Sequence, residues 1–215
     1  MSPLILAIDT TTEFGSIALV RGAAVLAELA LDAPAGYGQV LFDEISLLLG
    51  QHKLALSDID CFASANGPGT FTGVRVGLAT VKGLAYALSK PICAVSNLEA
   101  IASMGTKPLR AVFLDARRGD VFGAIFDAEL NLLEQEVVTP LPRWIESLPK
   151  TEIELMTTST TVYEALPITK VSDRLAVQIG RIAAQRFPAG KYSSPEAIDA
   201  NYVRRADAES SWVDR

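Results

Sequence analysis

Short apolar runs separated by polar turns dominate the first half of the chain. Residues 4–8 form a nearly continuous apolar run that ends at Asp9, as expected for a strand covered on both faces. Residues 16–20 and 24–31 read as two further strands. The pattern then predicts a helix at 39–49, a strand at 59–65, a helix at 71–88 and a strand at 91–96.

The same plan starts again near residue 109. An apolar strand ends at Asp115, a polar turn follows, a Phe-Gly pair opens the return strand, and a third strand comes next, as in "LAIDTTTEFGSIAL" earlier. The period is too long for a solenoid, so it indicates two related α/β domains, each a mixed sheet flanked by helices. We place them at residues 1–106 and 107–215, and expect a helix at 172–187 that begins at a Ser172 cap.

Composition narrows the chemistry. With a net charge of −6 the chain is a poor binder of nucleic acid by itself, because phosphate contacts need clustered positive charge. The single histidine, His52, follows a predicted helix end and is expected at the surface, so a two-histidine metal site or a metallopeptidase lacks its ligands. Cys61 and Cys93 lie in apolar stretches and are expected to be reduced and buried. No segment has the features of a membrane span or a signal peptide, and we expect a cytoplasmic protein.

Two aspartates end equivalent strands and are the first candidates for a site. Ligands of open α/β sheets collect beyond the carboxyl ends of the strands. Asp9 and Asp115 could therefore hold Mg²⁺ on a nucleotide, with Thr10, Thr11 and Thr12 donating to a phosphate. Equally, each aspartate could accept N–H groups of its own turn.

A glycine-rich loop, "NGPGTFTG", precedes the helix at 71–88. It is not a nucleotide-binding P-loop, because no Gly-Lys-Ser/Thr follows. Gly67 and Gly69 could turn backbone N–H groups toward an anion at the helix start. A tight strand-to-helix turn explains the same glycines and is slightly favoured by their spacing.

The helix at 71–88 carries only two charged residues, Arg75 and Lys82. Its Gly73 and Gly77 together cost about 2 kcal/mol of helix propensity, which indicates close approach of another backbone. Because the helix at 39–49 is also unusually apolar, we expect a protein interface here; the alternative is a thick three-layer core. The predicted interface residues are Leu41, Phe42, Ile45, Leu48, Leu49, Phe71, Gly73, Val74, Gly77, Thr80 and Leu84.

Several segments resemble signatures of the TsaB family. "GPGTFTGVRVG" at 67–77 is similar to the family motif G-P-G-[ST]-F-T-G-[LV]-R-[IV]-G. The segments at 6–19 and 114–126 resemble its N-terminal and second-domain signatures, and "NYVRRADAE" at 201–209 resembles its tail. The likeness is strong over residues 4–127.

This resemblance implies the duplicated fold of actin, Hsp70 and sugar kinases, and a subunit without catalysis of its own. It implies pairing with TsaD, the paralogue that transfers a threonylcarbamoyl group to N6 of adenosine 37 in tRNA. The same resemblance implies that the ATPase TsaE joins the complex and that tRNA is met only through the complex. The helices at 39–49 and 71–88 correspond to the pairing surface of the family.

Other properties stay open at this stage. We expect no cofactor of the chain's own, with ATP or ADP and Mg²⁺ at the complex interface as the further alternative. An unpartnered apolar patch would favour a homodimer. Tyr37-Gly38 stands where the family commonly has His-Ser or His-Thr, which weakens the predicted helix cap. The competing function is a stand-alone ATPase or small-molecule kinase that uses Asp9 and Asp115.

Overall fold

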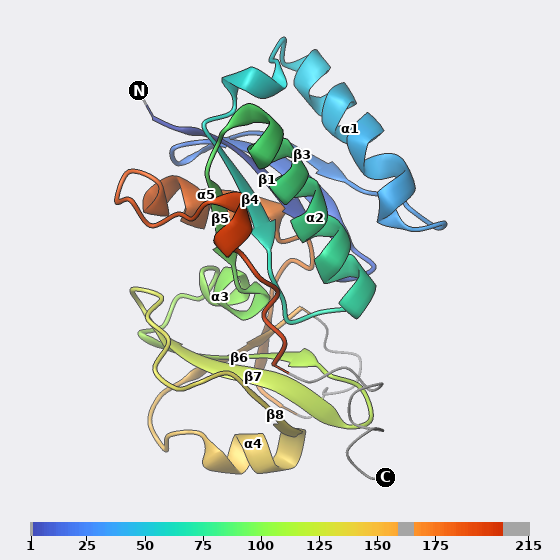
Figure 1. The fold of residues 1–215 in the computed structure, drawn as a ribbon. Helices are drawn as coiled ribbons and strands as arrows, with labels where there is room; N and C mark the ends of the chain where they lie inside the picture. Colours follow the sequence, from blue (N-terminus) through green and yellow to red (C-terminus); the bar gives the residue numbers. More distant parts are fainter. Residues whose placement is uncertain (1, 159–165, 204–215) are drawn as a thin grey trace. The chain divides into compact units, whose positions relative to one another are not determined.

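The computed structural model describes residues 2–158 and 166–203 of the chain. The chain divides into two compact units (Figure 1). The first unit comprises residues 1–97 and 174–200, and the second comprises residues 98–173 and 201–215. The tail motif at 201–209 lies largely outside the described residues, and so do Arg204 and Arg205.

The first unit is built on a five-stranded mixed sheet in the order β3-β2-β1-β4-β5. Strands β1 and β2 are antiparallel, β2 and β3 are antiparallel, and β1, β4 and β5 run parallel. The central strands are buried along their whole length, which explains the continuous apolar runs of the sequence. The strands span β1 Leu4–Asp9, β2 Ser16–Arg21, β3 Ala24–Ala30, β4 Cys61–Ala65 and β5 Ile92–Val95.

Helices cover both faces of this sheet. Helices α1 (Tyr37–Gln51) and α2 (Phe71–Leu88) lie side by side on one face, and their buried residues share one core with β1 and β2 (Figure 1). Helix α5 (Ala176–Arg186) packs on the opposite face. An added Cβ at Gly180 of α5 would meet Val20 and Ala7, whose side chains point to that face. The short 3-10 turns η1 (Leu56–Asp58) and η2 (Pro195–Ala197) complete the unit.

Helix α5 differs from the prediction in its start and in its place. It begins at Ala176 instead of residue 172, and the side chain of its N-cap residue, Leu175, makes no capping hydrogen bond. The helix belongs to the second half of the sequence but is part of the first unit. The chain therefore crosses back to cover the first sheet, a non-local contact that helical periodicity does not predict.

The second unit repeats the topology of the first. Its sheet has the order β10-β9-β6-β7-β8, in which β6 occupies the place of β1. Strands β6 and β7 are antiparallel, β7 and β8 are antiparallel, and β6, β9 and β10 run parallel. This confirms the predicted duplicated α/β fold. The elements span α3 Asn97–Ala102, which bridges the boundary, β6 Leu109–Asp115, β7 Asp120–Asp127, β8 Val137–Pro140, α4 Leu141–Ser147, β9 Glu154–Thr157 and β10 Ile168–Lys170.

The two Phe-Gly pairs are not equivalent in the fold. Gly15 directly precedes β2, whereas Gly123 lies inside β7 opposite Phe113. An added Cβ at Gly123 would overlap the indole of Trp144, so this glycine makes room for a core side chain. The two pairs match in sequence but not in structural position, although the strand order that the match suggested is right.

Candidate functional site

Asp9 lies fully buried at the carboxyl end of β1. Its Oδ1 accepts hydrogen bonds from the backbone N–H of Thr11 (2.9 Å) and from the Thr11 hydroxyl (2.6 Å). Burial raises the pKa of the Asp9 carboxyl, and the hydrogen bonds from Thr11 and Asn97 oppose this only in part. The carboxyl thus closes its own turn and is held in surroundings that favour its protonated form.

Three side-chain oxygens near the ends of neighbouring strands are buried and accept no hydrogen bond within the described chain. They are Asp9 Oδ2 after β1, Asn66 Oδ1 after β4 and Asn97 Oδ1 after β5. The Nδ2 group of Asn97 donates to the Thr11 hydroxyl (2.6 Å), which ties two of these residues together. Oxygen donors suit Mg²⁺, and Asp9 supplies the one carboxyl among these three groups. Within the described residues no cluster of three His, Cys, Asp or Glu side chains could hold a metal.

The glycine loop packs against the turn that follows Asp9. The Thr70 N–H donates to the Thr11 carbonyl (2.7 Å), and the Thr10 hydroxyl donates to the Gly73 carbonyl (2.7 Å). The Thr70 hydroxyl in turn caps α2 by accepting from the Gly73 N–H (3.2 Å). These polar groups have partners inside the chain, as the tight-turn interpretation expects. Anion binding by Gly67 and Gly69 stays a prediction.

Two glycines of α2, Gly73 and Gly77, face the chain's own backbone and side chains. An added Cβ at Gly73 would overlap the Thr10 carbonyl oxygen, and one at Gly77 would lie 2.7 Å from the Thr10 hydroxyl. A Cβ at Gly69 of the loop would likewise meet Thr11 at 2.6 Å. The close approach inferred from the helix glycines is therefore an internal contact, and their assignment to a partner surface was wrong.

Most of the predicted interface residues are also internal. Their side chains form the core between the two helices and the sheet, so their apolar character needs no partner. This corrects the expectation for Leu41, Ile45, Leu48, Leu49, Val74 and Thr80. Leu84 is half-buried, and only Phe42 and Phe71 of the predicted set are exposed.

The outer faces of α1 and α2 nevertheless carry large exposed apolar side chains. These are Phe42 (56% exposed) and Leu47 (51%) on α1, and Phe71 (42%) and Tyr86 (73%) on α2. We call these four residues the pairing surface. The Arg75 guanidinium lies 3.5 Å above the centre of the Phe71 ring, which covers part of that ring. Leu47 and Tyr86 were missed because the helical pattern was read for its inward face.

Asp115 ends β6 in a different environment. It is exposed, and its Oδ1 accepts from the backbone N–H of Arg117 (2.7 Å). Arg117, Arg118 and Gly119 all have positive φ angles. Each aspartate therefore accepts N–H groups of its own turn, the local interpretation of the two that the sequence left open.

His52 and the two cysteines lie where the sequence predicts them. His52 is exposed, and Cys61 and Cys93 are buried free thiols. Burial raises the pKa of Cys61 to about 12. The described part of the chain contains no helix that is long and apolar enough to cross a membrane.

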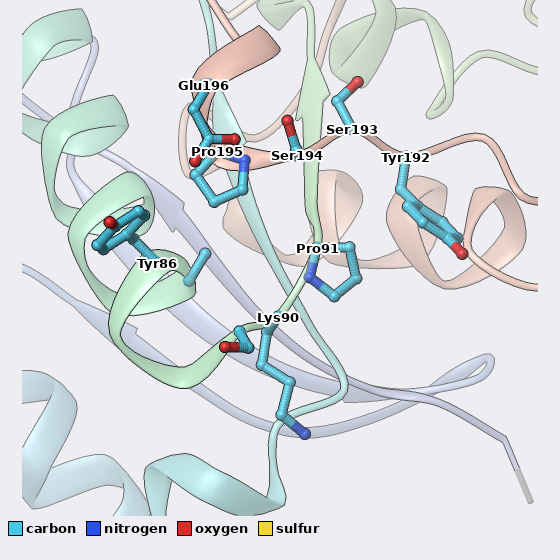
Figure 2. Close-up of a pocket in the computed structure, with 10 residues that line it drawn as sticks. Tyr86, Lys90, Pro91, Tyr192, Ser193, Ser194, Pro195 and Glu196 are labelled. Atoms are coloured by element: carbon cyan, nitrogen blue, oxygen red, sulfur yellow. The ribbon is translucent and has the colours of Figure 1, made fainter.

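A pocket that the sequence did not predict lies between the end of α2 and the segment before η2 (Figure 2). Its volume is about 670 Å³, and Tyr86, Lys90, Tyr192 and Glu196 are among its lining residues. It opens near Pro91, which precedes β5, whereas Asp9 lies at the opposite, carboxyl end of the strands. The pocket is therefore separate from the Asp9 turn.

Comparison with known proteins places this geometry in a family. The family model described as TsaD, tRNA N6-adenosine threonylcarbamoyltransferase, matches residues 36–181. The chain is 32% identical to the tRNA threonylcarbamoyladenosine biosynthesis protein TsaB of Bacillus subtilis, over 98% of each chain. It is 31% identical to the Escherichia coli protein of the same name, over 93% of this chain and 94% of that one.

A solved structure is similar to this chain in its fold. The YeaZ-like protein of Pseudomonas aeruginosa, described as similar to the peptidase YeaZ, superposes with a TM-score of 0.79 at 29% identity. The match covers 94% of this chain and 100% of that chain. The chain therefore belongs to the TsaB family of tRNA threonylcarbamoyladenosine biosynthesis proteins.

Proposed function

We propose that this chain is a non-catalytic, activating subunit that pairs with a TsaD-type threonylcarbamoyltransferase through α1 and α2. The observation that carries the proposal is the pairing surface itself. Phe42 and Leu47 are exposed on α1, and Phe71 and Tyr86 are exposed on α2, two helices whose buried residues share one core over the same face of the sheet. Large apolar side chains gathered on neighbouring elements are typical of protein interfaces.

The Asp9 turn supports a role without catalysis of its own. Thr10 and Thr11 use their hydroxyls inside the chain, and the Asp9 carboxyl is buried with a raised pKa. A general base or a metal ligand needs a carboxylate that the ligand can reach. In our proposal the partner supplies the catalytic residues, and this chain supplies a surface that shapes them.

The proposal extends to the rest of the assembly. A TsaE-type ATPase joins the pair, and tRNA binds through the complex. Any ATP or ADP with Mg²⁺ is held at the complex interface. The free chain forms a homodimer through the pairing surface, because large apolar side chains of that surface are exposed. The protein works in the cytoplasm, where tRNA is modified.

The direct test is threonylcarbamoyladenosine formation on tRNA in a reconstituted reaction. The mixture contains threonylcarbamoyl-AMP synthase, the TsaD-type and TsaE-type partners from the same organism, and this chain present or absent. We expect product only when the chain is present. Equal product formation without the chain would contradict an activating role.

One observation favours a second candidate function, a stand-alone ATPase or kinase. Asp9 Oδ2 has no hydrogen-bond partner in the described chain and lies at the carboxyl end of β1, beyond which ligands of open α/β sheets collect. This function requires Mg²⁺-dependent nucleotide turnover by the purified chain that is lost in Asp9→Asn. We expect no turnover.

A further inference from the structure

The turn between β1 and β2, residues 10–15, contacts the N-terminal ends of both helices of the pairing surface. We call it the first turn. Its polar groups are directed to the starts of α1 and α2, two segments that lie far apart in the sequence.

On the side of α2, the contact is tight and has several parts. The Thr11 carbonyl accepts from the N-cap residue Thr70 (2.7 Å), and the Thr10 hydroxyl donates to the Gly73 carbonyl (2.7 Å). Gly73 and Gly77 allow the helix to approach because neither carries a Cβ. The start of α2 is therefore held directly by the first turn.

On the side of α1, a single side chain makes the connection. The Tyr37 hydroxyl accepts from the Gly15 N–H (2.7 Å) and donates to the Thr12 carbonyl (2.8 Å). The tyrosine ring lies where a side chain of residue 15 would stand, since an added Cβ at Gly15 would be 2.5 Å from Cζ of Tyr37. Gly15 and Tyr37 are thus matched in shape as well as in hydrogen bonding.

The N-terminal end of helix α1 has no side-chain cap. Its N-cap residue, Gly36, has a φ angle of 99° and no side chain with which to cap the helix. Gly38 follows Tyr37, and an added Cβ there would contact nothing within 4 Å. Two glycines beside an uncapped start favour fraying, and the two hydrogen bonds of the Tyr37 hydroxyl tie this end of α1 to Thr12 and Gly15.

We propose that Tyr37 is a positioning residue that joins α1 to the first turn and thereby sets α1 relative to α2 for partner binding. The inference rests on the proposed pairing with a TsaD-type protein. The first turn holds α2 through Thr10 and Thr11 and holds α1 through Tyr37. The segment between β1 and β2 therefore connects the N-terminal ends of both helices.

The first experiment uses Tyr37→Phe, which removes both hydrogen bonds and keeps the ring over Gly15. In the isolated chain we expect amide hydrogen exchange at Gly15 and at the N-terminal end of α1 to become about tenfold faster. Exchange in the core of α2 should not change. We expect affinity for the TsaD-type partner to fall about tenfold, because α1 then loses its fixed start.

Tyr192→Phe is the control, since it removes one hydroxyl from an exposed tyrosine of the same unit. It should leave both exchange and affinity as in the parent chain. Faster exchange in Tyr37→Phe with unchanged affinity would overturn the positioning role. Unchanged exchange would overturn the structural link itself.

A double-mutant cycle tests the contact without any partner. Gly15→Ala should lower the unfolding midpoint in the parent, because the new methyl group overlaps the Tyr37 ring. In a Tyr37→Ser background the same change should have little effect, because the space is then free. Additive effects of the two substitutions would contradict the matched pair.

The outcomes separate this inference from the proposed function. If the parent chain does not bind the TsaD-type protein, the proposed function fails, whereas exchange and the cycle still report on the link. If the parent binds and Tyr37→Phe binds equally well, only the positioning role fails.

Discussion

The turns after β1 and β6 begin with the same residue type at equivalent places in two sheets of the same topology, yet their environments differ. Asp9 is fully buried, and its turn is covered by the glycine loop and the start of α2. Asp115 is exposed, and its turn runs through three residues with positive φ angles. We call residues 116–119, by analogy with the first turn, the second turn.

The difference shows that the environment of such a turn depends on the segment that packs over it. After β4 the chain supplies Gly69 and Gly73, which allow backbone to lie directly on Thr10 and Thr11. After β9 the sequence has no such glycines, and residues 159–165 lie outside the described residues. The two units share the same strand order. In the first unit the glycine loop and the start of α2 pack over the turn.

The largest expected effect comes from breaking that cover. Gly73→Ala places a methyl group against the Thr10 carbonyl, so α2 must move away from the first turn. Overpacking of this kind costs about 3 kcal/mol, against a gain of about 1 kcal/mol in helix propensity. We expect a net loss of about 2 kcal/mol in the free energy of unfolding, measured by denaturant titration.

Gly83→Ala is the control within the same helix. An added Cβ at Gly83 contacts nothing within 4 Å, so only the propensity gain remains. It should stabilise the isolated chain by about 1 kcal/mol. Equal effects at the two positions would mean that Gly73 does not pack on the first turn.

The free energy of unfolding should depend on pH through Asp9. The pKa of Asp9 is raised by burial, so the folded state binds this proton more tightly than the unfolded state. Its contribution to stability is fully present below the unfolded value near 3.8 and is lost as pH rises through the folded pKa. The loss has a slope of up to about 1.4 kcal/mol per pH unit.

Asp9→Asn should remove this slope and keep the acceptor for Thr11. The measurement is the free energy of unfolding against pH, taken as the difference between the parent and the variant. Asp115→Asn, which alters an exposed carboxylate, serves as the control and should change the curve less. A parent-minus-variant difference for Asp9→Asn that is flat with pH would contradict a raised pKa.

The smallest expected effect is in the second turn. Arg117 has a φ angle of 65°, a conformation that costs an ordinary residue about 1 kcal/mol. Arg117→Gly should therefore stabilise the chain by about 0.5 kcal/mol, after the higher entropy of an unfolded glycine is subtracted. Gly119→Ala should instead lower the stability of the chain, because alanine is strained at a φ angle of 84°. The new Cβ contacts no neighbouring atom, so backbone strain is the only cost. Thermal midpoints of the two variants should shift in opposite directions.

Local patterns predicted much of this fold correctly. The helix expected at 71–88 was found as Phe71–Leu88, and the strand ends at Asp9 and Asp115 were also found where expected. Strand order followed from the repeat, although the Phe-Gly match within it did not hold. Short-range periodicity and turn chemistry were enough for these features.

The faces of the helices could not be derived in the same way. Periodicity shows which residues share a face, but α2 is apolar on nearly every side, so it does not show which side meets the sheet. Gly73 and Gly77 were therefore assigned to a partner when they meet the first turn and, at Gly77, Ser64 of β4. The roles of Tyr37 and Asn97 depend on contacts with residues far away in the sequence, and no local signal reports them.

The central claim is that the outer face of α1 and α2 binds the TsaD-type partner. The most direct measurement is the affinity of that partner for the parent chain, for Phe42→Glu and for Leu133→Glu. Both side chains are exposed, but Leu133 belongs to the second unit, which makes it a matched control. We predict that Phe42→Glu weakens binding about 30-fold or more and that Leu133→Glu leaves it unchanged. Unchanged binding by Phe42→Glu, or a loss confined to Leu133→Glu, would contradict the claim.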